Sequence, residues 1–275
     1  VPDPSSVIQL PWKKEVAWVA SNCVMEEKPL AQAPRNVLRR LVDEAAKDGL
    51  RVKTGVEPEF FLLTPQGDKI ADPYDNAEKP CYDQQAMMRQ YDCIAEVCDY
   101  MLEMGWEAYQ NDHEDATGQY EMNWKYDDVL ATADKLSFFK FMMKSVAEKH
   151  GLRATFMPKP FKGLTGSGCH AHISVWSLDG KKNAFADNSK ELGLSDQGRH
   201  FLGGIMKHAS ALAANTRKSE RNTLPMDYTG FLRFHHGGKV REQNIQLLRQ
   251  CAASGKAQGK AMPAPARCRR LLHKA

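Results

Sequence analysis

Acidic and histidine residues gather at three places along one stretch of the chain, at spacings that could build a metal site. The clusters are Glu57-Pro58-Glu59, then His113-Glu114 with Glu121 seven residues after Glu114, and then Gly166-Ser167-Gly168-Cys169-His170-Ala171-His172. Each cluster lies in a pattern typical of a β-strand, where residues two apart point to the same face. Glu57 and Glu59 can therefore aim at one point, and so can His170 and His172.

Carboxylates that converge around an imidazole repel one another unless a cation lies between them. Hard divalent ions such as magnesium and manganese prefer mainly such oxygen ligands. The alternative for an isolated acid pair is a solvent-facing strand. For Glu59 this alternative is hard to sustain, because the core-like run Phe60-Phe61-Leu62-Leu63 follows it. The sequence therefore predicts a site for more than one divalent ion.

The composition is that of an ordinary globular protein. The chain has 275 residues, of which 42% are hydrophobic and 26% charged, so it can bury one large core or two small ones. No apolar run approaches the roughly 20 residues that span a bilayer, and no signal peptide is evident, so no membrane partner is expected. Seven cysteines without a disulfide-framework spacing predict a cytoplasmic protein.

The net charge of +4 is unevenly distributed along the chain. Residues 216–275 hold 13 Lys and Arg against 3 Asp and Glu, a net charge of +10, which leaves −6 for residues 1–215. An acidic body fits a metal-binding enzyme. The basic segment could be a nucleic-acid arm, but it lacks a compact Lys/Arg run and interleaved aromatic residues, so no nucleic-acid partner is expected.

Hydrophobic periodicity and capping residues predict alternating strands and helices. Helices are expected from Pro34 to Gly49, from Asp83 to Gly105, over 128–150 and from Ser195 to about Ala214. Strands are expected over 51–64, 106–111, 118–126, 152–158 and 169–177. The alternation indicates an α/β or α+β fold.

Three motifs in this order resemble the glutamine synthetase superfamily. They are Val56-Glu57-Pro58-Glu59-Phe60-Phe61-Leu62, then His113-Glu114-Asp115-Ala116-Thr117-Gly118-Gln119-Tyr120-Glu121, and then Phe156-Met157-Pro158-Lys159-Pro160 with Gly166-Ser167-Gly168-Cys169-His170-Ala171-His172. The resemblance runs from the first residue to about Asn215. The Asp after His-Glu, and Asn-Trp after the second acid, are most similar to the type III or methylamide-synthetase-like branch.

The resemblance implies an α+β fold, in which a curved, mainly antiparallel sheet carries the metal ligands and is backed by helices. It also divides the chain into a partial catalytic domain over residues 1–215 and a basic tail over 216–275. We expect this sequence to lack counterparts of the family's small N-terminal domain, Arg-rich segment, flap and last metal-ligand strand. We expect the tail to be poorly ordered, apart from a helix near Glu242 to Ala253.

The activity implied is ATP-dependent ligation of ammonia to the γ-carboxylate of glutamate through a γ-glutamyl phosphate. Methylamine as the acceptor is the alternative, as is a noncatalytic family member like lengsin. Family members assemble as homo-oligomeric rings with active sites between subunits. In the family, the N-terminal domain of one subunit completes the active site of the next. Because we expect this chain to lack that domain, ring assembly is doubtful and we expect little activity from the chain alone.

Site roles follow from the resemblance, position by position. Glu59, Glu114 and Glu121 match catalytic ligands of the ion near glutamate, and Glu57 and His170 match ligands of the ion that bridges the ATP phosphates. Both ions would be Mg²⁺ or Mn²⁺. The remaining matches are Gly166 and Gly168 for glutamate, and His172 and Ser174 for the nucleotide phosphates. His113 is interpreted as a structural histidine, and Cys169 as a small packing residue rather than a nucleophile.

Overall fold

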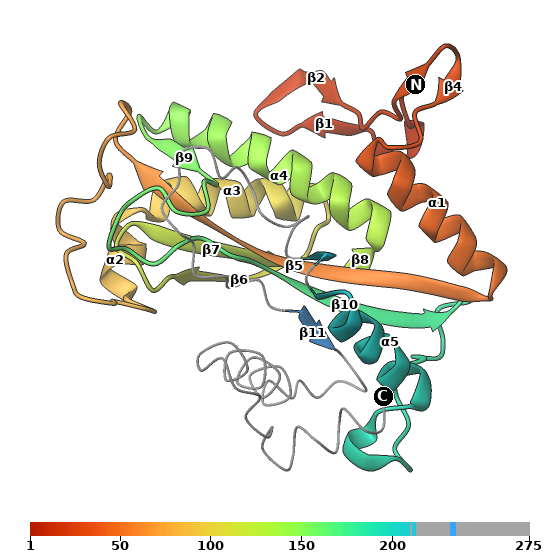
Figure 1. Ribbon diagram of the computed structural model, residues 1–275. Helices are drawn as coiled ribbons and strands as arrows, with labels where there is room; N and C mark the ends of the chain where they lie inside the picture. Colours follow the sequence, from red (N-terminus) through yellow and green to blue (C-terminus); the bar gives the residue numbers. More distant parts are fainter. Residues whose placement is uncertain (210, 213–231, 235–275) are drawn as a thin grey trace.

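Figure 1 shows a computed structural model of the chain, which describes residues 1–209, 211–212 and 232–234. Within these residues a seven-stranded sheet has the order β11-β10-β5-β7-β6, and β8 and β9 also pair with the long strand β5. Its strands are β5 Leu50–Leu63, β6 Ala108–His113, β7 Gln119–Trp124, β8 Asp127–Asp128, β9 Arg153–Thr155, β10 Cys169–Ser177 and β11 Leu232–Phe234.

Two short hairpins precede this sheet at the N-terminus. They pair β1 (Ile8–Leu10) with β2 (Lys13–Trp18), and β3 (Val24–Met25) with β4 (Lys28–Pro29). The helices are α1 Pro34–Lys47, α2 Gln84–Arg89, α3 Tyr91–Glu103, α4 Val129–Lys149 and α5 Asp196–Lys207, with short 3₁₀ turns at Pro4–Ser6 and Glu191–Gly193.

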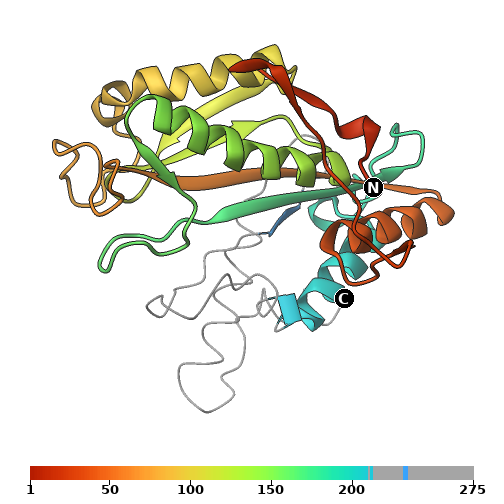
Figure 2. The same ribbon diagram turned by 90° about the horizontal axis from the view of Figure 1, so that it is seen from above.

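The sheet is mainly antiparallel and α3 and α4 lie on one of its faces, as Figures 1 and 2 show. The strand β5 pairs antiparallel with β7, β8, β9 and β10, and β6 pairs antiparallel with β7. The pairing of β10 with β11 is parallel. The predicted α+β class, with a mainly antiparallel sheet backed by helices, is confirmed.

The main core lies between this sheet and α3 and α4. Because side chains alternate along a strand, Phe60 and Leu62 of β5 point to the helices together with Tyr120 and Met122 of β7. Phe139 of α4 is fully buried against this layer, with ring centroids 6.1 Å from Phe60 and 5.1 Å from Trp124. A smaller cluster of Phe61, Leu63 and Ala116 covers the end of the opposite face.

The predicted helix from Asp83 to Gly105 is wrong in one respect, because it is two helices. Asp83 caps the first by accepting bonds from the Gln85 and Ala86 N–H groups, as expected. Gln90, with φ −110° and ψ 12°, then ends α2 and begins α3. In one continuous helix the apolar spacing of Met88, Tyr91 and Ile94 predicts that all three face inward, but Met88 and Tyr91, on either side of the break, are exposed. Leu102 is exposed as well, because the buried stripe of α3 runs through Ile94, Val97 and Met101.

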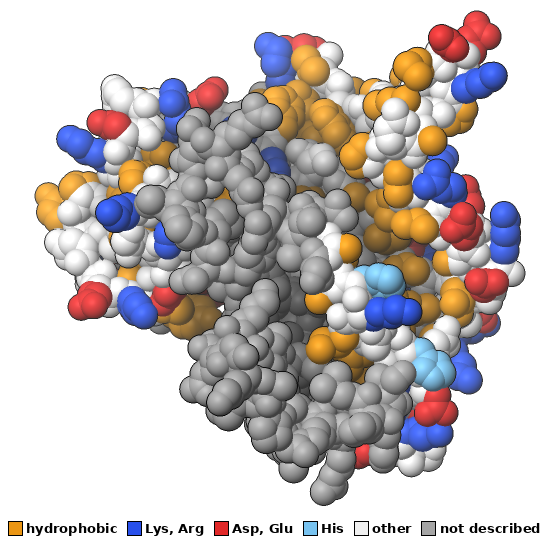
Figure 3. Space-filling view, in the orientation of Figure 1, with side chains coloured by type: hydrophobic (Ala, Val, Ile, Leu, Met, Phe, Trp, Pro, Cys, Tyr) orange, Lys and Arg blue, Asp and Glu red, His pale blue; other side chains and the backbone are white. Residues whose placement is uncertain are grey.

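The helix α1 begins at Pro34 as predicted, but none of its residues is fully buried. The helical spacing of Val37, Leu38, Leu41 and Ala45 predicts an apolar stripe, but Leu41 is 52% exposed. Figure 3 shows hydrophobic side chains at the surface over the N-terminal hairpins and α1. The predicted apolar stripe of this helix is therefore only partly covered.

Ser195 caps α5 as predicted, since its Oγ accepts the Gly198 N–H at 3.1 Å. No helix among the residues that the structure describes is long and apolar enough to cross a membrane. Of the segment 216–275, the description covers only Leu232–Phe234, which form β11. The helix predicted near residues 242–253 lies outside the described residues.

Candidate metal site

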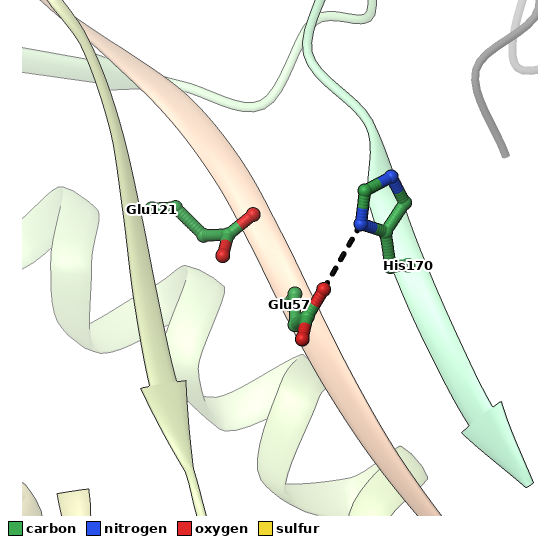
Figure 4. Close-up of side chains that lie close together, drawn as sticks. All are labelled: Glu57, Glu121 and His170. Atoms are coloured by element: carbon green, nitrogen blue, oxygen red, sulfur yellow. Dashed lines mark hydrogen bonds and ion pairs between the residues drawn. The ribbon is translucent and has the colours of Figure 1, made fainter. Parts of the chain in front are cut away.

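The sheet face opposite α3 and α4 brings the first group of predicted ligands together. Glu57 of β5 pairs with His170 of β10, and Glu59 of β5 pairs with Glu121 of β7. One ligand atom each from Glu57, Glu121 and His170 lies within 4.8 Å of the others. Figure 4 shows these three side chains directed toward one another from three adjacent strands.

Glu57 is the centre of a carboxylate–imidazole cluster. Its Oε2 lies 2.9 Å from His170 Nδ1, and its Oε1 lies 2.7 Å from His172 Nε2. The two histidines are two residues apart on β10, so they lie on the same face of the strand, as the strand periodicity predicts. Both carboxylate oxygens of Glu57 therefore have a ring nitrogen beside them.

A second group forms around the turn that follows β6. Oxygen atoms of Asp112, Glu114 and Glu121 lie within 4.8 Å of one another, so Glu121 belongs to both groups. The sequence reasoning missed Asp112. Its position two residues before Glu114, directly after the strand predicted over 106–111, was a signal that could have identified it, and β6 pairs it directly with Glu121.

Glu59 lies opposite Glu121 but is not in either three-residue group. Its Oε2 accepts the Gly168 N–H at 2.8 Å and a Gln119 side-chain N–H at 3.1 Å. The resemblance implies that Glu59 shares an ion with Glu114 and Glu121. Asp112 is the third carboxylate within 4.8 Å of Glu114 and Glu121, and the role of Glu59 at that ion stays a prediction.

Burial and mutual repulsion raise the pKa values of these carboxylates. The pKa of Glu114 rises to about 8, mainly through burial, and Glu121 and Glu59 add to the rise. Burial likewise raises the pKa of Glu121 to about 7, although a bond from Asn123 opposes this shift. The pKa values of Glu59 and Asp112 are also raised by burial. Because a divalent cation would offset this repulsion, and hard oxygens with one imidazole suit Mg²⁺ or Mn²⁺, the residues fit the predicted ions.

The glycine segment reaches this face through close backbone contacts. A Cβ atom on Gly166 would lie 2.6 Å from the Pro158 carbonyl oxygen, which excludes any larger residue without a backbone shift. The Ser167 N–H donates to the same oxygen at 2.7 Å, and the Gly168 N–H donates to Glu59. The segment is thus packed against the Phe156–Pro160 motif, with which the sequence groups it.

The predicted nucleotide residues extend from the acidic cluster along β10. His172 pairs with Gly55, and Ser174 pairs with Lys53. Ser174 is buried and accepts the Trp176 indole N–H at 2.8 Å. His172 and Ser174 lie on the same sheet face as Glu57, so one elongated ligand could contact these two residues and the acidic cluster.

His113 is fully buried, as its structural interpretation predicts. Its Nε2 lies 2.7 Å from Asp75 Oδ2, which also accepts the Gly118 N–H at 2.5 Å. Asp75 was not identified from the sequence, because 38 residues separate it from His113. Cys169 is exposed at the start of β10, so the prediction that it is a small packing residue is wrong.

A cavity of about 580 Å³ lies elsewhere, between the N-terminal turn, α1 and the beginnings of β5 and α4. Apolar side chains such as Val42, Val52 and Leu130 line it, together with Arg35 and Arg51. Both arginines are engaged by aspartates, Arg35 by Asp3 and Asp134 and Arg51 by Asp128. None of the predicted site residues lines this cavity.

Comparison with known proteins places this site in a family. The family model described as Glutamine synthetase, catalytic domain, matches residues 31–220. A protein named glutamine synthetase from Rhizobium meliloti (strain 1021) is 76% identical over 216 residues, which are 78% of this chain and 50% of that protein. A glutamate–methylamine ligase from Methyloversatilis universalis is 38% identical over 218 residues, 78% of this chain and 49% of that protein.

A solved structure described as apo GmaS without ligand has a TM-score of 0.76 and 56% identity, and the match covers 78% of this chain and 50% of the other. The chain thus spans about half the length of the curated relatives that it matches. The acidic and histidine motifs that form the site lie inside the matched residues. The chain belongs to the glutamine synthetase family and contains sequence of its catalytic domain.

Proposed function

We propose that this chain carries divalent-metal and substrate positions for an ATP-dependent ligation of ammonia to the γ-carboxylate of glutamate. The reaction would pass through a γ-glutamyl phosphate. The observation that carries the proposal is the convergence of Glu57, Glu121 and His170, and of Asp112, Glu114 and Glu121, on one sheet face. Their buried carboxylates need positive charge nearby, and a phosphoryl-transfer site supplies it as metal ions.

Each part of this face has a proposed role. Bound Mg²⁺ or Mn²⁺ would offset charge on the transferring phosphoryl group and hold the reactants in line. Glu57 and His170 would hold the ion at the ATP phosphates, and Glu59, Glu114 and Glu121 the ion at glutamate. The backbone at Gly166 and Gly168 would contact glutamate, and the nucleotide phosphates would lie near His172 and Ser174. These roles are carried over from the family match, residue by residue.

The acceptor amine is the open choice between two reactions of this class. Ammonia is supported by the 76% identity to a relative named glutamine synthetase. Methylamine is the alternative, supported by the glutamate–methylamine ligase at 38% identity and by the GmaS structure at 56%. The cytoplasmic location inferred from the cysteines stays a prediction, and so does the expectation from the resemblance that ring assembly is doubtful for this chain.

The metal part of the proposal is tested by titrating the purified chain with Mn²⁺ in a calorimeter. We expect saturable binding that is weakened at least tenfold by Glu57→Gln, because Glu57 lies against both His170 and His172. The matched control is Glu15→Gln, which makes the same change at an exposed residue of β2. Absence of binding would favour the noncatalytic alternative over the enzyme.

The reaction itself is tested by phosphate release with glutamate, ATP and Mn²⁺, using ammonium and methylammonium in parallel. We expect a low rate from this chain, abolished by Glu59→Ala. A higher kcat/KM for methylammonium would overturn ammonia as the first choice. A robust rate that survives Glu59→Ala would contradict the role proposed for that residue.

A further inference from the structure

Gln119 is a buried polar residue at the point where the three sequence motifs meet. It is the first residue of β7, directly after the 114–118 turn, and its side chain is fully buried. Across the sheet it pairs with Phe61, two residues after Glu59. A buried amide in this position must have its hydrogen bonds satisfied inside the protein.

The orientation of the Gln119 amide follows from one backbone contact. The Ala116 N–H lies 3.1 Å from Gln119 Oε1, and a backbone N–H can only donate. The oxygen of the amide must therefore face Ala116, and the NH₂ group must face the other way. There it donates to Glu59 Oε2 and to Ser167 Oγ, each at 3.1 Å.

These bonds connect three separate parts of the site. Glu59 belongs to β5, Ser167 to the glycine segment, and Ala116 to the turn that carries Glu114. Glu59 Oε2 also accepts the Gly168 N–H at 2.8 Å. With Oε2 held by two donors, the carboxylate has one fixed orientation, and Oε1 is the oxygen that we assign to the cation.

We infer that Gln119 is a positioning residue, which orients the Glu59 carboxylate for a divalent cation and ties that orientation to the glycine segment. The inference rests on the proposed function, because it assumes that Glu59 binds the ion. Residues that orient metal ligands in this way typically contribute about 10–100-fold to metal affinity. Gln119 would do so without contacting the ion.

A purely structural role is the competing explanation, since the Gln119–Ala116 bond also closes the turn. The two explanations differ in whether the effect passes through Glu59. A double-mutant cycle on Mn²⁺ affinity separates them, because residues that act through one contact are not additive. The variants are Gln119→Met, which keeps the side-chain length but loses the NH₂ donors and the oxygen that accepts the Ala116 N–H, and Glu59→Gln, which removes the acceptor charge.

The experiment measures Mn²⁺ affinity of the full chain by calorimetry, with thermal unfolding without metal as a check on folding. We expect Gln119→Met to weaken binding about 10–100-fold in the original chain. In the Glu59→Gln background it should change binding by less than about threefold, because the residue that it orients is already altered. Gln9→Met is the matched control, since it makes the same change at an exposed glutamine of β1, and it should bind Mn²⁺ normally.

A second variant keeps the inference testable if Gln119→Met does not fold. Gln119→Asn retains the amide but is one methylene too short to reach both Ala116 and Glu59, so it should show the same loss of affinity. Normal Mn²⁺ binding by these variants, or an equal loss in the Glu59→Gln background, would overturn the inference alone. Failure of the unsubstituted chain to bind Mn²⁺ would instead overturn the proposed function and the inference with it.

Discussion

The two faces of the central sheet use the same strands in opposite ways. On the face toward α3 and α4, Phe60 and Tyr120 lie in a closed apolar core. On the opposite face, Glu57, Glu59 and Glu121 crowd together with raised pKa values at Glu59 and Glu121. Burial stabilises the first face through the hydrophobic effect and destabilises the second through desolvated charge. Alternate residues of β5 and β7 therefore have different roles: one set packs in the apolar core, and the other forms the candidate metal site.

Carboxylates on the two sides of the molecule show the same contrast. Burial alone would raise the pKa of Glu96 on α3, but hydrogen bonds from Lys149, Tyr100 and His150 lower it to about 2. Glu114 has other carboxylates as neighbours, and its pKa rises to about 8. Glu96 has cationic partners within the chain, whereas Glu114 would obtain its positive neighbour by binding an ion.

The largest effect is expected from a cavity in the helix-side core. Phe139→Ala removes a fully buried ring that packs on Phe60, Trp124 and Phe156, and should lower the free energy of unfolding by about 3–5 kcal/mol. Urea unfolding measures this change. The control Phe141→Ala, at a ring that is 42% exposed, should cost much less. Equal losses from the two variants would contradict the core as described here.

The second prediction is a substitution that should raise the stability of the chain and lower its metal affinity. Glu121→Gln removes the charge that both acidic groups share, while its remaining oxygen can still accept the Asn123 amide. The metal-free chain should melt at a higher temperature, because one buried charge is gone. Mn²⁺ affinity should fall by at least about 10–100-fold, since even residues that only orient ligands contribute that much.

Calorimetry and thermal melting on the same preparation test both signs. Glu107→Gln is the matched control, because Glu107 is exposed and pairs with Lys125. It should change neither quantity beyond the small contribution of a surface ion pair. A Glu121→Gln chain that is less stable without metal would show that the acidic face is not under electrostatic strain.

The strands that carry the site and the starts of two helices were predictable from the sequence, because they depend on residues that are close together along the chain. Spacing of two placed Glu57 with Glu59 and His170 with His172, and the structure has both pairs on facing strands. The Asp83 cap and the start of α1 at Pro34 depend on adjacent residues and were also predicted. Local rules therefore gave the strands that carry the site.

Contacts between distant segments were not predictable in this way. Asp75 reaches His113 across 38 residues, and Gln119 reaches Glu59 across 60. Asp112 had the correct spacing from Glu114, but its role depends on the register of β6 against Glu121. The break at Gln90 has no glycine or proline to announce it. The details that position the ligands arise from tertiary pairing, which one sequence does not specify locally.

The smallest expected effect is a pH dependence on the helix side that leaves the metal site unchanged. Glu96 accepts bonds from Lys149 and His150, which connect α3 to the end of α4. Because its pKa is lowered to about 2 in the folded chain, the folded state binds fewer protons than the unfolded state below about pH 4.5. Its stabilisation is therefore present at neutral pH and is lost as the pH falls toward about 2.

Glu96→Gln should remove this dependence. The variant should be slightly less stable than the original chain at pH 7, by the small amount typical of partly exposed ion pairs, and the two should converge near pH 2. Urea unfolding between pH 2 and 7 measures the difference, and the same substitution at exposed Glu148 is the control. Mn²⁺ affinity at pH 7 should be unchanged, because α3 packs on the face away from Glu57 and Glu121. A Glu96→Gln chain that loses Mn²⁺ affinity would show that the two faces are energetically coupled, and the separation drawn from their alternating side chains would fail.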